Sequence, residues 1–439
     1  MPYQSGNRLP GEKASKLGHL EVLKSELVNK LCSSFEQPTK DEDITSQEIV
    51  WQPYPNDHEP LQIIFGVDGS IQTVKGDTVP RKEMSFIKTA LLRLDQKALA
   101  KIDKNTPHPF ALKKILTNSA LYHATVLPLK NVRIPGVSVS DSVREVIFES
   151  MKDASLNGEP LETLKWIVYE KWDGQEKAIP PFQCPHCPSQ AATLPYDADK
   201  GTCTRCGGEL LITDMLGFHQ DMAEEFAPET VGTSYMLIHE TMLLFTGIRL
   251  YWQSNKEILN DCLFIKDGPL SIRAQYSKLV APIRRFFAFA KSQGITVHLM
   301  GQEKTGRFVD FLDMSHRNAP VGSIFIPGDK FIKEEVQHRP DEGAAYGIDT
   351  NYGSKVFVKV DEYHHMVISI PTGNFTPDPT VDDLIGSDRI FSTLPTILSS
   401  RFEGALLPIE LANGVASLST YPSARILHIF ADSFESKSN

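Results

Sequence analysis

The chain has 439 residues and a mass of 49.0 kDa, enough for two to three domains or one large domain with insertions. Hydrophobic residues make up 41% and charged residues 23%, which excludes a wholly disordered chain and a fibrous protein. The 55 acidic residues outnumber the 45 basic ones, so the surface as a whole does not coat nucleic acid, although a local basic groove stays compatible.

The sequence lacks two features that would direct a protein to a membrane or out of the cell. No run of 18 apolar residues is present, which predicts that the chain does not span a membrane. The segment MPYQSGNRLPGEK is polar and has none of the apolar character of a secretory signal. We therefore expect a cytoplasmic protein.

Hydrophobic spacing predicts the elements in chain order. Leucines at three- and four-residue intervals indicate a helix over 14–36, and prolines indicate a long loop over 37–60. Further helices are predicted over 141–154, 160–172, 233–252, 276–294 and 400–432, the last with a break at Tyr421-Pro422. Strands are predicted over 61–70, 82–94 (or a strand passing into a helix), 261–270, 295–304, 321–327, 355–361 and 364–371, the last two as a hairpin. This order predicts an α/β fold, a mixed sheet flanked by helices.

Four of the six cysteines form two C-x-x-C motifs, Cys184-Pro-His-Cys187 and Cys203-Thr-Arg-Cys206, with 15 residues between them. Four thiolates at this spacing are typical of a closed tetrahedral Zn²⁺ site, which has no open position for a reacting water. We therefore predict a structural zinc ribbon. It either stabilises the fold locally or contacts DNA or a partner, and the sequence leaves that choice open.

Two apolar segments, IIFGVDGS and CLFIKDGP, each end in Asp-Gly, at Asp68 and Asp267. Asp-Gly after a strand is also a common turn signal, so the pattern alone does not distinguish a hairpin from a site. Glu240 lies in an apolar helix, where a carboxylate is costly unless it is paired or binds a metal. Three carboxylates on two strand ends and a buried helix predict a site for Mg²⁺ or Mn²⁺. Glu257 is the alternative third carboxylate, although it lies in a polar connection.

The order of these motifs resembles the NurA-domain nucleases, which process DNA ends and have an RNase H-like core. The resemblance rests on Val67-Asp68-Gly69-Ser70, on Asp267-Gly268-Pro269-Leu270, on Lys304 after a strand, and on Tyr421-Pro422 followed by His428. It implies catalytic roles for Asp68, Glu240, Asp267, Lys304, Tyr421 and His428. The implied metal ligands are Asp68, Glu240, Asp267 and His428, the last as ligand or proton donor.

The resemblance also implies an organisation of the chain. Residues 1–60 are the N-terminal helix and linker, 61–180 and 213–439 are the two parts of the nuclease core, and 181–212 are an inserted zinc ribbon. It implies manganese-dependent 5′-to-3′ exonuclease action on DNA, and single-strand endonuclease action, in repair or in defence against phage.

The partners implied by the resemblance are a second copy, forming a homodimer, and a hexameric HerA-type ATPase. The segment GQEKTGRF lacks the GxxxxGK[S/T] pattern of a P-loop, so any ATP-driven motor must come from another subunit. Arg284 and Arg285, on the basic side of the helix after Asp267, are candidates for contact with the DNA backbone. Two other functions stay open: a non-catalytic zinc-ribbon adaptor that binds DNA or a motor, and another RNase H-like activity such as RNA cleavage or strand transfer.

Overall fold

The computed structural model describes residues 22–35, 49–55, 57–99, 120–399, 404–418 and 423–433. The chain divides into two compact units, residues 1–46 and 47–439. In the first unit, helix α2 (Glu26–Ser34) begins at Ser25, whose hydroxyl accepts a hydrogen bond from the Val28 amide. Tyr421 and the N-terminal part of the helix predicted over 14–36 lie outside the described residues.

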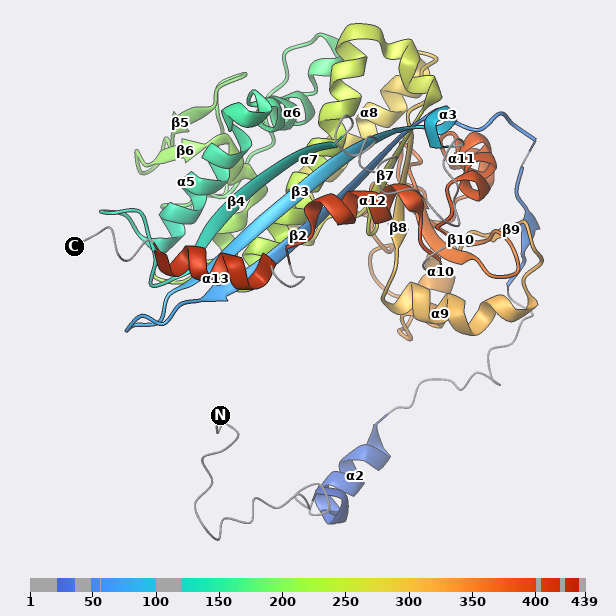
Figure 1. The fold of residues 1–439 in the computed structure, drawn as a ribbon, viewed down its shortest axis with the longest axis horizontal. Coiled ribbons are helices and arrows are strands. Elements are labelled where there is room, and N and C mark those ends of the chain that lie inside the picture. The colour runs from blue at the N-terminus through green and yellow to red at the C-terminus, as the bar shows by residue number, and fades with distance from the viewer. Residues whose placement is uncertain are drawn as a thin grey trace. The chain divides into compact units, whose positions relative to one another are not determined.

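The second unit contains a nine-stranded mixed sheet in the order β1-β9-β10-β11-β8-β7-β2-β3-β4 (Figure 1). Its strands are β1 (Gln52–Pro53), β2 (Ile63–Lys75), β3 (Glu83–Asp95), β4 (Ala120–Lys130), β7 (Cys262–Asp267), β8 (His298–Glu303), β9 (Ser323–Phe325), β10 (Ser354–Lys359) and β11 (His365–Ile370). β2, β3 and β4 form an antiparallel meander, whereas β2, β7 and β8 are parallel neighbours. The predicted hairpin of the last two strands is confirmed.

Helices cover both faces of this sheet (Figure 1). The helices that the structure describes in this unit are α3 (Gln96–Leu99), α5 (Val139–Met151), α6 (Glu159–Val168), α7 (Glu229–Asn255), α8 (Val280–Ser292), α9 (Arg307–Ser315), α10 (Asp329–Phe331), α11 (Ser387–Thr393), α12 (Leu407–Ala416) and α13 (Ser423–Ser433). Among the described residues, no helix is both long enough and apolar enough to cross a membrane.

The two faces of the central strands carry separate cores. On one face, α7 packs on β2 and β3, and its Tyr235 and Met242 lie in a large core together with Val67. On the other face, α12 crosses β2 so closely that a Cβ on Gly66 would meet the Pro408 carbonyl oxygen at 2.7 Å. Because β7 is covered on both faces, its first four residues, CLFI, are all apolar instead of alternating with polar ones.

One strand boundary predicted from the sequence is wrong. The sequence predicts that the first strand ends at Asp68-Gly69, yet β2 continues to Lys75. The reason is the pairing with β3, in which Asp68 lies opposite Ala90 and Gly69 opposite Thr89. Gly69 has a packing role here, because a Cβ at that position would meet Glu240 Oε1 at 2.5 Å and Met236 Cγ at 2.6 Å.

The ribbon insertion is held by two short strands, β5 (Lys200–Thr202) and β6 (Glu209–Leu211), which pair antiparallel. Arg144 of α5 ties the ribbon to the rest of the fold. Its guanidinium donates to both carboxylate oxygens of Asp214, at 2.8 and 2.9 Å, and to the Glu209 carbonyl oxygen at 3.2 Å. His186 also contacts the Glu209 carbonyl, with 2.9 Å between its Nε2 and that oxygen, so its ring packs within the ribbon itself.

Candidate functional site

Two neighbouring parallel strands place an aspartate each side by side. In the ladder between β2 and β7 the last registered pair is Val67 with Lys266, so Asp68 and Asp267 follow at the next position of each strand. On the other side of β7, Asp267 pairs with Gln302 of β8. Because neighbouring positions of parallel strands lie at the same level of the sheet, the two aspartates are neighbours. The carboxyl ends of parallel strands are a usual place for a site in an open α/β sheet.

Asp68 is buried, with 4% of its surface exposed. Its Oδ1 accepts a 2.7 Å hydrogen bond from the Gly69 amide, whereas its Oδ2 has no hydrogen-bond partner among the described residues. Burial, followed by the charges of Asp267 and Glu240, raises the pKa of Asp68 to about 8. The ionised form of this carboxylate therefore needs a cation to compensate it at neutral pH.

Glu240 of α7 is buried and reaches the same end of β7. Its Oε2 accepts a hydrogen bond from Lys266 Nζ at 3.2 Å, and the same ammonium donates to the Asp267 carbonyl oxygen at 2.9 Å. Burial raises the pKa of Glu240 even though the charge of Lys266 opposes this change. Glu240 therefore depends on a positive charge to stay ionised, and Lys266 supplies one.

Lys304 lies just after β8, and its Nζ is 3.0 Å from Asp267 Oδ1. The ammonium is partly exposed to solvent, so it faces the open side of the cluster. The structure thus brings together Asp68, Glu240, Asp267 and Lys304, and adds Lys266, which the sequence motifs do not include. A lysine within the apolar strand CLFIKD was the available signal, because a buried ammonium requires a partner.

Glu257, the alternative third carboxylate, lies elsewhere. It is exposed in the 3₁₀ segment Lys256–Asp261, which leads into the first residue of β7. Asp267 is the last residue of that strand, so Glu257 and Asp267 are at opposite ends of it. Between the two candidates, the structure places Glu240 beside the aspartates.

His428 is half-buried on α13. On the same helix the ring of Phe430 is 6.3 Å from that of Phe86, which pairs with Gln72, four residues beyond Asp68 along β2. No described contact joins His428 to the carboxylates. Its role in the site, like that of Tyr421, stays a prediction.

Arg284 and Arg285 are both engaged within the protein. The Arg284 guanidinium donates to the carbonyl oxygens of Ile348, at 2.7 Å, Gly347, at 3.0 Å, and Asn351. Arg285 Nε donates to Glu170 Oε1 at 2.6 Å. Arg285 is nevertheless exposed to solvent, and the predicted contact of either side chain with DNA stays untested.

A groove of about 1160 Å³ opens beside Lys304, between α9 and α12. Much of its wall is apolar, with Val309, Leu312, Met366, Leu411 and Ala405 among the residues that line it. Two acidic residues of the wall are paired, Glu303 with Lys355 and Asp313 with His365. The groove is linked to the carboxylate cluster through Lys304, which lines it and pairs with Asp267, whereas Asp68, Glu240 and Asp267 themselves do not line it.

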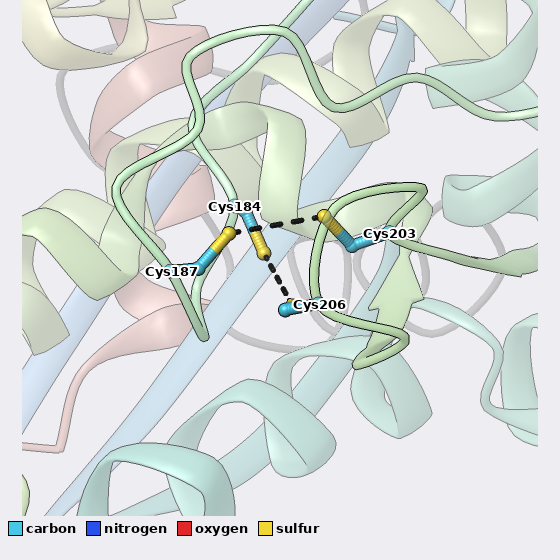
Figure 2. Close-up of side chains that lie close together, drawn as sticks. All are labelled: Cys184, Cys187, Cys203 and Cys206. Carbon is cyan, nitrogen blue, oxygen red and sulfur yellow. Dashed lines mark hydrogen bonds between the residues drawn. The ribbon is translucent and has the colours of Figure 1, made fainter.

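The four ribbon cysteines converge, as Figure 2 shows. All four sulfur atoms lie within 4.8 Å of one another, with 3.8 Å between those of Cys184 and Cys206 and 3.9 Å between those of Cys187 and Cys203. Four thiolates bound to one Zn²⁺ at about 2.3 Å in a tetrahedron would be about 3.8 Å apart. The cluster is therefore compatible with a metal ion such as zinc.

Removing one of these thiolates is expected to destabilise the ribbon. Cys203→Ser should lower the zinc content from one ion per chain to well below one and lower the melting temperature, because three cysteines do not close the site. Metal analysis and thermal denaturation measure both effects. Cys262→Ser is the matched control, since this cysteine is buried in β7 away from the ribbon and should leave the zinc content unchanged. A protein that is fully stable and contains no metal would contradict the prediction.

The carboxylate cluster is less compact than the cysteine cluster. Within the described part of the chain, the four cysteines are the group of metal-binding residue types whose ligand atoms all lie within 4.8 Å of one another. Lys266 and Lys304 hold two of the carboxylates by ion pairs. The donor set still suits a divalent cation, because it consists of carboxylate oxygens, one of which, Asp68 Oδ2, is buried without a partner.

Comparison with known proteins does not identify a family for the chain. No family model matches the chain, and no curated protein matches it. Among solved structures, one described as "Crystal structure of NurA" aligns with 11% sequence identity and a TM-score of 0.30, over 95% of this chain and 97% of that one. At this TM-score and sequence identity, the similarity supports no conclusion about fold or function.

Proposed function

We propose that the chain is a divalent-metal-dependent deoxyribonuclease with an RNase H-like core. The observation that carries this proposal is the meeting of Asp68, Glu240 and Asp267 at one end of the parallel strands, where burial and mutual repulsion raise the pKa of Asp68 to about 8. The meander β2-β3-β4, extended by the parallel strands β7 and β8, supports the RNase H-like assignment. The choice of DNA follows from the sequence motifs that resemble NurA-domain nucleases.

Asp68, Asp267 and Glu240 would hold the catalytic Mn²⁺ or Mg²⁺. Ions bound in this way supply an activated water and neutralise the oxygen that leaves from a phosphodiester. For its part, the protein supplies anionic ligands on rigid strands and an ammonium, that of Lys304, on the open side of Asp267. This ammonium stabilises negative charge on the phosphate as the bond to the leaving oxygen breaks.

Lys266 has a different task. It lies inside the fold, where its charge opposes the rise that burial causes in the pKa of Glu240, and it ties Glu240 to the backbone of Asp267. This contact fixes the helix α7 against the end of β7, so that the third carboxylate is positioned before any ligand arrives. Positioning of this kind lowers the cost of assembling the site when substrate binds.

Degradation of labelled DNA tests the proposed activity. Purified protein with Mn²⁺ should degrade DNA, and the same protein without added divalent ion should not. Single-stranded DNA, duplex DNA and RNA of one sequence, compared in parallel, define the substrate. Binding of DNA without cleavage under every metal condition would instead favour the adaptor function, and cleavage of RNA alone would favour another RNase H-like activity.

The groove beside Lys304 yields a separate prediction. Gly414 of α12 lines it, and a Cβ at this position meets no atom within 4 Å. Gly414→Trp should therefore obstruct part of the groove without disturbing the fold and lower DNA cleavage about tenfold or more, while Gly414→Ala should leave cleavage nearly unchanged. Cleavage rates and melting temperatures of the two variants provide the check. Unchanged cleavage by a folded Gly414→Trp protein would show that DNA does not enter this groove.

The proposal includes the assembly implied by the sequence resemblance, a homodimer that acts with a HerA-type ATPase ring. The motor must come from another subunit, because the sequence has no P-loop. Light scattering across micromolar concentrations should give the mass of a dimer. A strict monomer over that range would count against the assembly and would leave the proposed chemistry of the site unaffected.

A further inference from the structure

Gln302 lies beside the two aspartates, on the same face of the sheet. It pairs with Asp267 in the ladder between β7 and β8, and Asp68 occupies the corresponding level of β2. Side chains at one level of adjacent parallel strands point to the same face, and residues two apart along a strand share a face. Gly66, two residues before Asp68, faces Pro408 of α12, which identifies this face as the one covered by α12.

Two oxygens on this face are buried without partners. Gln302 is completely buried, and its Oε1 has no hydrogen-bond partner among the described residues. The same is true of Asp68 Oδ2. The orientation of the Gln302 amide is fixed by its nitrogen, which donates to the Gly404 carbonyl oxygen. A reversed amide would bring two carbonyl oxygens together, so the nitrogen must face Gly404 and the oxygen must face away from it.

The oxygens of Asp68, Asp267 and Gln302 are all acceptors when the aspartates are ionised. The nearby ammonium of Lys304 is paired with Asp267 Oδ1, and that of Lys266 with Glu240. A single cation satisfies several acceptors at once, and amide oxygens join carboxylates as ligands of hard divalent ions.

We infer that Gln302 Oε1 is a further ligand of the divalent ion, together with Asp68 and Asp267. This inference rests on the proposed function and extends it by one neutral ligand that the sequence motifs do not include. A neutral oxygen completes the ligand set without adding negative charge. The site can therefore still accept an anionic phosphate next to the ion.

Two substitutions at this position distinguish a metal ligand from a residue that only holds the loop at Gly404 by a hydrogen bond. Gln302→Glu keeps an oxygen ligand but cannot donate to the Gly404 carbonyl, whereas Gln302→Leu lacks both functions. Titration of zinc-loaded protein with Mn²⁺ in a calorimeter, without DNA, measures the affinity directly. We expect Gln302→Leu to weaken Mn²⁺ binding about tenfold or more and Gln302→Glu to retain or strengthen it. Thermal stabilisation by Mn²⁺ should follow the same order.

The control is Gln62→Leu. Gln62 lies just before β2, and its side-chain amide donates a hydrogen bond to the Pro60 carbonyl at 2.9 Å. This substitution should leave the affinity for Mn²⁺ unchanged. Equal loss of Mn²⁺ affinity in the Glu and Leu variants would show that Gln302 acts only through its hydrogen bond to Gly404. Unchanged Mn²⁺ affinity in both variants would show that Gln302 has no role in binding the ion. Should the Leu variant fail to fold, loss of affinity in Gln302→Glu overturns the inference. Absence of Mn²⁺ binding by the unmodified protein would instead overturn the proposed function itself.

Discussion

Replacing Asp68 with Asn is expected to abolish DNA cleavage and, without added manganese, to stabilise the protein at alkaline pH. Cleavage should fall by a factor of about a thousand or more, since a neutral amide replaces an anionic ligand whose charge is felt by the other two carboxylates. Rates measured with Mn²⁺ and labelled DNA test this part. Asp77→Asn, at an exposed position between β2 and β3, should have the activity of the unmodified protein.

The expected stability gain follows from the pKa of Asp68, which burial and neighbouring charges raise to about 8 from an ordinary value of 3.8. Below the ordinary pKa value Asp68 is protonated in both the folded and the unfolded chain, and its ionisation does not lower the free energy of unfolding. As the pH rises from there to about 8, the unfolded chain releases its proton first, so folding becomes less favourable. Above pH 8 the cost is constant. Each pKa unit corresponds to about 1.4 kcal/mol, so the cost reaches several kcal/mol.

The neutral amide of the Asp68→Asn variant carries no such cost. The difference in unfolding free energy between the variant and the unmodified protein should therefore be small at pH 4 and largest above pH 8. Denaturant unfolding with zinc retained and no manganese added measures it. A variant that is less stable than the unmodified protein at pH 8.5, or one that cleaves DNA normally, would show that Asp68 does not have the environment described.

Glu240→Gln is expected to lose most activity, at least a hundredfold, and to weaken Mn²⁺ binding, whereas Glu257→Gln should be close to neutral in both respects. The reason is position: Glu240 is buried beside Lys266 and the aspartates, and Glu257 is exposed at the far end of β7. Steady-state cleavage and calorimetric titration of the two variants provide the comparison. If Glu257 were essential and Glu240 dispensable, Glu257 and not Glu240 would be the third carboxylate of the site.

The same substitution should also destabilise the protein. The amide introduced by Glu240→Gln can still accept a hydrogen bond from Lys266, but it leaves that ammonium buried without an anion, which costs about 3–5 kcal/mol in comparable buried pairs. Glu240→Gln combined with Lys266→Met removes both charges and should recover much of the stability without recovering activity. A double variant no more stable than Glu240→Gln would show that loss of the ion pair is not the cause of the destabilisation by Glu240→Gln.

Sequence patterns predicted the elements that are strongly apolar or periodic. The helix over 233–252 corresponds to α7, and the strands over 261–270 and 295–304 correspond to β7 and β8. Their burial on both sides leaves a continuous apolar pattern that local spacing detects. The candidate carboxylates could be chosen for the same reason, because a charge in an apolar segment is conspicuous.

Local patterns could not predict features that depend on distant partners. β2 continues through Asp68-Gly69 because β3 pairs with it, and the usual meaning of Asp-Gly as a turn is overridden. β4 was not predicted, since its sequence ALYHATVLPLK is exposed at many positions of an edge strand and lacks a clear alternation. The pairing of Lys266 with Glu240 joins residues 26 apart, and no spacing rule connects a helix to the strand that follows it in this way.

The proposed function requires that Asp68 and Asp267 bind a catalytic divalent ion distinct from the ion of the ribbon. The most direct test is a crystal structure of the protein grown with Mn²⁺, with anomalous difference maps recorded at the manganese and zinc absorption edges. We expect a manganese peak in contact with carboxylate oxygens of Asp68 and Asp267, and a separate zinc peak among the four cysteines. A zinc peak at the cysteines with no manganese at the aspartates would contradict the proposed function.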